Sequence, residues 1–310
     1  MHRQTYIFAV VAAAVAVLGA FVFLADDRTA VEVRSGRIDV VASFYPLAEF
    51  AAKVGGNMVA VSNITPAGTE PHDFEPTPRQ VASIYGSHLF VYNGGGVDVW
   101  ASRLAGAIGE RGVKTLEMRP LMGELLPPVD QEEGEMFDEH FWLDPVLAQR
   151  QVEAIRDALA GIDPAHAAEY RDRADSYVAE LRSLDADFRR GLASCQIREA
   201  ITSHAAFAYL ARRYGFTQLA IAGLSPDEEP SAGALAALVR EAERRGIRHV
   251  FFETLASPEM AETLAREIGA QTLVFNPLEG LTGEELVTGK NYLTVMRQNL
   301  ANLRTAMVCP

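Results

Sequence analysis

The sequence predicts an α/β protein of two lobes, each a parallel-rich sheet flanked by helices, with one long helix bridging the lobes. Strand-like segments alternate with helix-like segments in both halves of the 310-residue chain. This alternation is typical of parallel sheets that helices cover on both faces. Between the halves, apolar residues recur at helical spacing from Tyr170 to Phe188. The composition, 49% hydrophobic and 22% charged, is that of a globular chain long enough for two domains.

The first half opens on a strand, a turn at Pro46 and a helix that ends at Gly55 and Gly56. Apolar runs bounded by turn residues predict strands over residues 37–42, 57–65, 89–96 and 113–118. The segments between them predict helices over residues 46–54, 78–88 and 97–109.

The middle of the chain departs from this rhythm. Residues 122–139 are acidic and contain prolines, which predicts a surface loop. A helix over 144–164 and a longer one within 165–193 follow. The apolar stripe of the longer helix consists of Tyr170, Ala174, Tyr177, Leu181, Leu184 and Phe188. A helix of about 26 residues is about 39 Å long, enough to run along two lobes.

The second half repeats the first. It predicts strands over residues 199–204, 216–223, 247–253 and 270–276, and helices over 205–215, 231–246, 257–269 and 291–307. We therefore expect lobes at 38–145 and 190–310, with 146–189 as the helical linker. Ligands of open α/β sheets bind beyond the carboxyl ends of the strands, so the two lobes would share a cleft there.

The N-terminal residues 1–37 read as an export segment with a short linker. Residues 6–25 carry no charge and follow Arg3, and twenty such residues are long enough to cross a bilayer as a helix. An uncleaved signal-anchor is the first interpretation, and a cleaved signal peptide is the second. Both place the body of the protein outside the cytoplasm, in the periplasm or at the cell surface.

Charge and cysteines agree with export. The formal net charge of −13 argues against a nucleic-acid surface. In an oxidising compartment Cys195 and Cys309 would tie the C-terminus to the body through a disulfide. The alternative is a pair of buried free thiols.

Three histidines stand where a strand or an acidic loop gives way to the next element: His72, His140 and His204. Prolines surround His72 in "GTEPHDFEPTP", and the next comparable junction is Asn276. Each histidine alone fits a packing or capping role. Three at matching junctions instead predict a metal site, because converging neutral imidazoles suit zinc.

Several motifs in order carry a family resemblance. They are "TPAGTEPHDFEPTPRQ", "DEHFWLDP", "TSHAAFAYLARRYGF", "GLSPDEEPS" and "FNPLEGLTGEELVTGKNYLTVMRQNL". From about residue 38 to the end, the chain resembles the zinc/manganese solute-binding proteins of ABC importers. The resemblance implies a rigid bridging helix, a monomer, and capture of a divalent metal ion for delivery to an ABC permease and its ATPase.

The same resemblance implies His72, His140, His204 and Asn276 as the metal ligands. Histidine at position 204 implies Zn(II) rather than Mn(II), which remains the alternative. Aspartate is usual in the family where this chain has Asn276, so water or Glu279 are alternatives for the fourth ligand. A C-terminal cysteine tied back to the second lobe also occurs in relatives.

Two other classes of function stay open. A zinc hydrolase would need a carboxylate base such as Glu70 or Glu139, but the chain has no HExxH helix and no nucleophile elbow. An anchored adhesion or structural protein would bind no stoichiometric metal.

Two details of the expected metal site follow from the chemistry of imidazole. Carboxylates should orient the rings, and we expect Glu75, Asp144 and Glu253 to do so. Affinity should fall below about pH 6.5, because imidazole ligands must be deprotonated.

Overall fold

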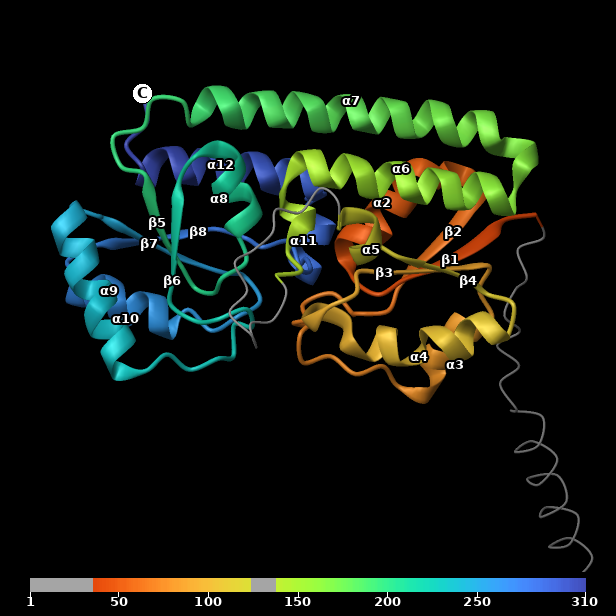
Figure 1. Cartoon of the computed structure of the whole chain (residues 1–310), viewed down its shortest axis with the longest axis horizontal. Helices are drawn as coiled ribbons and strands as arrows, with labels where there is room; N and C mark the ends of the chain where they lie inside the picture. The colour runs from red at the N-terminus through yellow and green to blue at the C-terminus, as the bar shows by residue number, and fades with distance from the viewer. Residues whose placement is uncertain (1–35, 124–137) are drawn as a thin grey trace, which may run out of the picture. The chain divides into compact units, whose positions relative to one another are not determined.

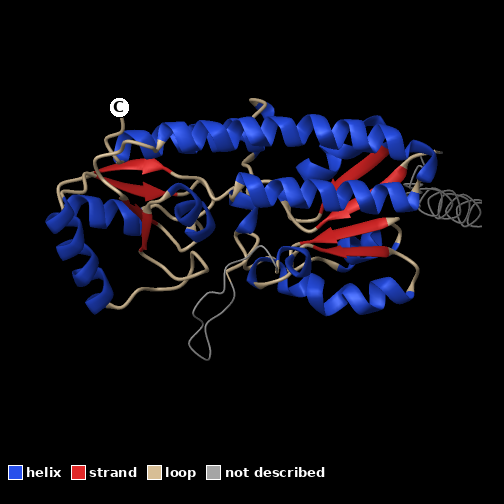
Figure 2. Ribbon diagram, turned by 45° about the horizontal axis from the view of Figure 1, so that its top comes forward, coloured by secondary structure: helices blue, strands red, loops and turns tan. Residues whose placement is uncertain are grey.

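Two four-stranded sheets, both wholly parallel, form the centres of the two lobes (Figures 1 and 2). The computed structural model describes residues 36–123 and 138–310. The first sheet has the order β2-β1-β3-β4 and the second β6-β5-β7-β8, so the two lobes share one topology. The strands are β1 (Ile38–Ala42), β2 (Val59–Asn63), β3 (Leu89–Tyr92), β4 (Lys114–Glu117), β5 (Glu199–Thr202), β6 (Thr217–Ala220), β7 (His249–Phe252) and β8 (Gln271–Val274). The predicted fold class is confirmed.

Helices connect the strands within each sheet, join the first sheet to the second and follow the last strand. They are α2 (Tyr45–Gly55), α3 (Pro78–Tyr85), α4 (Val99–Glu110), α5 (Arg119–Met122), α6 (Pro145–Ile162), α7 (Ala167–Gly191), α8 (Ala208–Tyr214), α9 (Ala232–Arg245), α10 (Glu259–Glu267), α11 (Gly283–Val287) and α12 (Tyr292–Ala306). Within residues 36–123 and 138–310, every strand and helix predicted from the sequence is present. The short helices α5 and α11 were not predicted, because one or two turns show no helical period.

Helix α7 is the predicted bridging helix. It has 25 residues, about 37 Å at 1.5 Å per residue. All six residues of its predicted apolar stripe are buried. It packs against α6 and α2 of the first lobe and against α12 of the second (Figure 1). One helix therefore contributes to the cores of both lobes.

The core beneath α7 is continuous between the lobes. Phe50 of α2 contacts Tyr177 of α7 and Tyr292 of α12, with ring centroids 6.1 and 5.1 Å apart. Glu49, beside Phe50, accepts hydrogen bonds from the Tyr177 hydroxyl at 3.2 Å and the Tyr292 backbone at 2.7 Å. The opposite face of each sheet has its own smaller core. Moving one lobe against the other would disturb this shared layer, so the structure favours a stiff connection.

The predicted disulfide between Cys195 and Cys309 is confirmed. It joins the segment after α7 to the end of the chain. Backbone hydrogen bonds from Gln196 to Val308 and from Ile197 to Met307 run beside it. The C-terminus is therefore held against the second lobe.

The predicted signal-anchor and most of the acidic loop lie outside the described residues. Across residues 36–123 and 138–310, no helix has both the length and the apolar character needed to cross a membrane. The lobe and linker boundaries given above remain predictions.

Candidate metal centre

The three predicted histidines meet at one point, together with Glu279. His72 lies in the loop between β2 and α3, His140 directly before the short helix Phe141–Leu143, and His204 just after β5. Glu279 lies in the loop that follows β8. One ligand atom from each residue falls within 4.8 Å of the others. As expected, the group lies where strands of the two sheets end and both lobes contribute.

Glu279 Oε1 is the centre of this cluster. It lies 3.4 Å from His72 Nε2, 3.3 Å from His140 Nε2 and 3.2 Å from His204 Nε2. The Nε2 atoms of His140 and His204 are themselves 3.3 Å apart. The side chains of His140, His204 and Glu279 are fully buried, and that of His72 is 5% exposed. Four donors of types that bind zinc therefore point at one another out of contact with bulk water.

The loop that carries His72 is tied at both ends. Gly68 donates a backbone hydrogen bond to the Leu281 carbonyl, which attaches this loop to the one that bears Glu279. At the other end, Thr77 and Gln80 form a capping box that starts α3. The Gln80 amide also donates to the Ile64 carbonyl at 2.8 Å. These bonds and the surrounding prolines restrict where the imidazole can lie.

The segment that carries His140 belongs to the first half of the chain, yet it is bonded to the second lobe. Trp142 Nε1 donates to the Pro277 carbonyl at 2.8 Å, and the Tyr292 hydroxyl donates to the Trp142 carbonyl at 2.6 Å. The Tyr209 hydroxyl donates to the Asp138 carbonyl at 2.8 Å. His140 is therefore held close to His204 and Glu279 before any metal arrives.

A carboxylate stands behind each imidazole. His140 Nδ1 lies 2.8 Å from Asp138 Oδ1, and His204 Nδ1 lies 2.7 Å from Glu253 Oε1. His72 Nδ1 lies 3.9 Å from Glu139 Oε1. A proton on Nδ1 shared with a carboxylate leaves Nε2 free to act as a ligand, and it orients the ring.

Of the three carboxylates expected to orient the rings, Glu253 does so and two do not. Glu75 pairs with Arg103 instead. Asp144 pairs with Arg213 and caps α6. Asp138 and Glu139 were missed, although both stand beside His140 in "DEHFWLDP".

The electrostatics of the cluster show strong coupling between acids and imidazoles. Burial lowers the pKa of His140, but hydrogen bonds to Asp138 and Glu279 outweigh it and raise the pKa to about 9. Burial also disfavours charge on His204, yet Glu253 and Glu279 raise its pKa well above the usual value. For Glu279 burial raises the pKa, but the histidines hold it well below its usual range. The carboxylates therefore favour positive charge at this cluster.

Further buried acids surround the cluster. Burial and then the charge of Glu279 raise the pKa of Glu70 to about 9, and burial raises that of Glu139. Among the described residues, one or both carboxylate oxygens of several acids are buried without a hydrogen-bond partner: Glu70, Asp138, Glu139, Glu253 and Glu279. Buried charges are normally paired or bound to metals, so this donor set fits a divalent cation.

The Asn276 side chain makes hydrogen bonds of its own. Its side-chain amide donates to Thr254 Oγ1 at 2.8 Å and accepts from the Leu278 backbone at 2.7 Å. The fourth member is Glu279, which the sequence analysis offered as an alternative.

Comparisons with known proteins identify zinc-binding relatives. Residues 40–306 match the model of the family described as "Zinc-uptake complex component A periplasmic". The chain is 40% identical over 279 residues to the zinc-binding lipoprotein AdcA of Streptococcus pneumoniae, covering 87% of this chain and 56% of AdcA. It is 36% identical over 292 residues to the high-affinity zinc uptake system protein ZnuA of Bacillus subtilis, covering 91% and 92%.

A solved structure is similar as well. The Zn(II)-bound ZnuA-like domain of Streptococcus pneumoniae AdcA superposes with a TM-score of 0.76 at 39% identity, covering 88% of this chain and 99% of that domain. The chain thus spans little more than half of the AdcA protein but nearly all of its ZnuA-like domain. The chain belongs to the family of periplasmic zinc-uptake complex components to which ZnuA belongs.

Proposed function

We propose that this protein captures Zn(II) outside the cytoplasm and delivers it to the permease of an ABC importer. The observation that carries the proposal is the buried cluster of His72, His140, His204 and Glu279. The relatives named for zinc binding and zinc uptake support the same cargo. The family supports a permease and its ATPase as partners.

The spacing of the donors fits zinc. Four ligands at about 2.0–2.1 Å in a tetrahedron lie about 3.3–3.4 Å from one another. The three Nε2 atoms stand 3.2–3.4 Å from Glu279 Oε1, and His140 and His204 stand 3.3 Å apart. The distances from His72 to the other two imidazoles fall within 4.8 Å. Closing the site therefore needs only a small shift of the His72 loop.

The chemistry of the donors favours zinc over manganese. Three imidazoles and one carboxylate suit a borderline ion, whereas Mn(II) prefers mostly oxygen ligands. We assign Glu279, rather than Asn276 or water, as the fourth ligand, because its carboxylate is charged and faces the imidazoles.

A binding role fits this donor set better than catalysis does. Catalytic zinc sites keep one position open for water, whereas sites with four protein ligands are closed. Here four protein donors surround one point. We therefore expect no hydrolysis of ester or amide substrates by the zinc-loaded protein, and turnover above the rate of free zinc would contradict this. We also expect a monomer held at the membrane by its N-terminal segment.

Calorimetric titration of the metal-free protein with Zn(II) and Mn(II) tests the proposal. We expect one tight zinc per chain, weaker manganese, and a large loss of zinc affinity in His204→Ala. His166→Ala is the matched control, because His166 is exposed and pairs with Asp163 away from the cluster. Absence of stoichiometric zinc, tighter manganese, or equal losses in the two variants would refute the site.

A further inference from the structure

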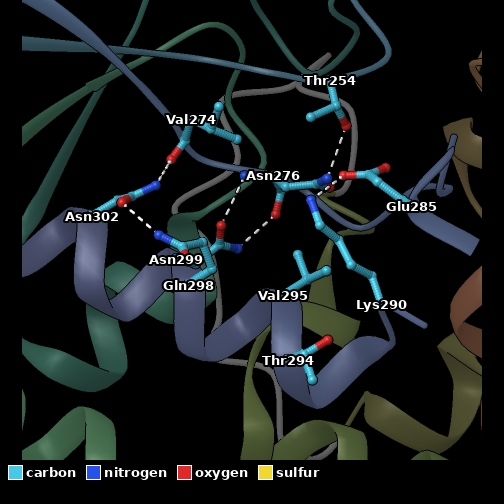
Figure 3. Close-up of a pocket in the computed structure, with 10 residues that line it drawn as sticks. All are labelled: Thr254, Val274, Asn276, Glu285, Lys290, Thr294, Val295, Gln298, Asn299 and Asn302. Carbon is cyan, nitrogen blue, oxygen red and sulfur yellow. Dashed lines mark hydrogen bonds and ion pairs between the residues drawn. The ribbon is translucent and has the colours of Figure 1, made fainter. Parts of the chain in front are cut away.

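We propose that Asn276 and Asn299 are positioning residues that hold the Glu279 carboxylate in the zinc site. This inference rests on the proposed function and goes beyond it, because neither residue is assigned as a ligand. It arises from a network of hydrogen bonds behind the loop that bears Glu279 (Figure 3).

The network begins on α12. Asn299 is buried, and its amide binds both backbone groups of Asn276: it accepts from the Asn276 N–H at 2.9 Å and donates to the Asn276 carbonyl at 2.7 Å. Figure 3 shows these bonds between the helix and the chain that leaves β8. The Asn299 side chain therefore anchors Asn276, the second residue after β8, through both of its backbone groups.

Asn276 in turn restrains the residues that follow it. Its Oδ1 accepts from the Leu278 N–H at 2.7 Å. Leu278 has a φ of 57°, in the left-handed region that residues with side chains rarely adopt. A disfavoured conformation persists only where its surroundings enforce it. The Asn276 bond is one such restraint, and the Trp142 bond to the Pro277 carbonyl is a second.

The left-handed residue directly precedes Glu279. The turn at Leu278 therefore decides in which direction the Glu279 side chain leaves the loop. The Nδ2 group of Asn276 donates to Thr254 Oγ1. Thr254 directly follows Glu253, whose carboxylate lies against His204 Nδ1. One amide thus links the loop bearing Glu279 to the segment that orients His204.

A cavity of about 390 Å³ lies behind the network. It is lined by Asn276 and Asn299, together with Lys290, Gln298 and Asn302 (Figure 3). Asn276 itself is buried, and the nearby Phe275 and Leu278 belong to the hydrophobic core. Side-chain packing therefore holds the loop in place, and the hydrogen bonds of Asn276 and Asn299 act in addition to it.

The network also explains why the side chain at position 276 is an amide. Oδ1 is used by Leu278 and Nδ2 by Thr254, so neither end of the amide is free to turn toward the imidazoles. If position 276 were a ligand position, Asn276→Asp would raise zinc affinity by adding a charged donor. We expect no gain from Asn276→Asp.

The test compares zinc affinities, measured by competition with a chelator, for Asn276→Ala, Asn299→Ala and the control Asn302→Ala. Asn302 lies on the same helix and cavity wall, but it donates to the Val274 carbonyl within β8. Supporting residues of metal ligands typically change affinity about 10–100-fold, so we expect such losses in the first two variants and little change in the third. Asn276→Ala in a Glu279→Gln background should cost almost nothing more, because the two residues act through one carboxylate.

Each outcome has a defined meaning. A Glu279→Gln variant with unchanged affinity would overturn the ligand set and, with it, this inference. A large loss in Glu279→Gln, combined with equal affinities for Asn299→Ala and Asn302→Ala or with additive losses in the double variant, would overturn the positioning role alone. Should Asn299→Ala fail to fold, Asn299→Asp replaces it, because a carboxylate can still accept from Asn276 N–H but cannot donate to its carbonyl.

Discussion

His140 and His204, which are 64 residues apart in the chain, place their Nε2 atoms 3.3 Å from each other. Each ring has its own carboxylate behind it, Asp138 for His140 and Glu253 for His204. These two rings, together with Glu279, are three of the four proposed zinc ligands. The fourth, His72, lies in the loop between β2 and α3.

The Glu253 carboxylate should increase zinc affinity although it is not one of the proposed ligands. Glu253→Gln replaces a charged acceptor of His204 Nδ1 with a neutral amide, so we expect zinc affinity to fall about 10–100-fold. Competition against a chelator measures the loss. Glu259→Gln is the control and should leave affinity unchanged, because Glu259 is an exposed residue at the start of α10. Equal affinities for the two variants would show that Glu253 does not orient His204.

Zinc affinity should depend on pH at higher values than an ordinary histidine predicts. Neighbouring carboxylates raise the pKa of His140 to about 9 and hold that of His204 well above its usual value, so zinc competes with protons for both rings above pH 6.5 as well. Affinity should fall as pH drops from about 9, by up to tenfold per unit for each proton displaced. From the sequence, this fall was expected near pH 6.5, because the ordinary pKa of histidine does not take the neighbouring acids into account. Calorimetry in buffers of different ionisation enthalpy counts the released protons, and a flat profile between pH 9 and 7 would contradict the coupling.

The stability of the metal-free protein should change with pH in the opposite direction from zinc affinity, falling as pH rises. His140 has a raised pKa in the folded state, so its contribution to stability is fully present below about pH 6.5 and is lost as pH rises through about 9. Thermal unfolding in the presence of a chelator should therefore occur at lower temperature at pH 9 than at pH 6.5. His140→Ala should flatten this difference, whereas His166→Ala should preserve it.

Zinc should raise the free energy of unfolding, because it binds only the folded arrangement of donors from four separate segments. At a free concentration of 100 times Kd, linkage predicts about 2.7 kcal/mol. A chelator should abolish the increase, as should His204→Ala. Scanning calorimetry with and without zinc measures it, and an equal shift in His204→Ala would place the bound zinc elsewhere.

Loss of the disulfide should lower the stability of the folded protein but leave its zinc affinity unchanged. Cys195 and Cys309 are 114 residues apart, so reduction frees a long loop in the unfolded chain. We expect Cys195→Ser with Cys309→Ser to lower the free energy of unfolding by about 2–4 kcal/mol. Urea unfolding measures this, and the reduced parent protein should match the double variant. A large change in zinc affinity of the folded variant would mean that the C-terminal tie also shapes the site.

The sequence by itself determined the two-lobe α/β class and the succession of strands and major helices along the chain. It also determined which three histidines come together. These features are encoded locally. The apolar stripe from Tyr170 to Phe188 has the period of a helix, and the apolar runs have the length of buried strands. Each predicted histidine lies at a strand-to-loop junction or beside an acidic loop, and parallel sheets bring such junctions to one edge.

Only the tertiary structure shows that Glu279 lies beside the three histidines. Asn276 and Glu279 stand three residues apart in one loop, and spacing cannot say which faces the imidazoles. Leu278, in a left-handed conformation, directly precedes Glu279, and the Asn276 side chain is hydrogen-bonded to Leu278 and Thr254. These contacts join residues far apart in the chain, and their energies depend on distances that no local pattern records.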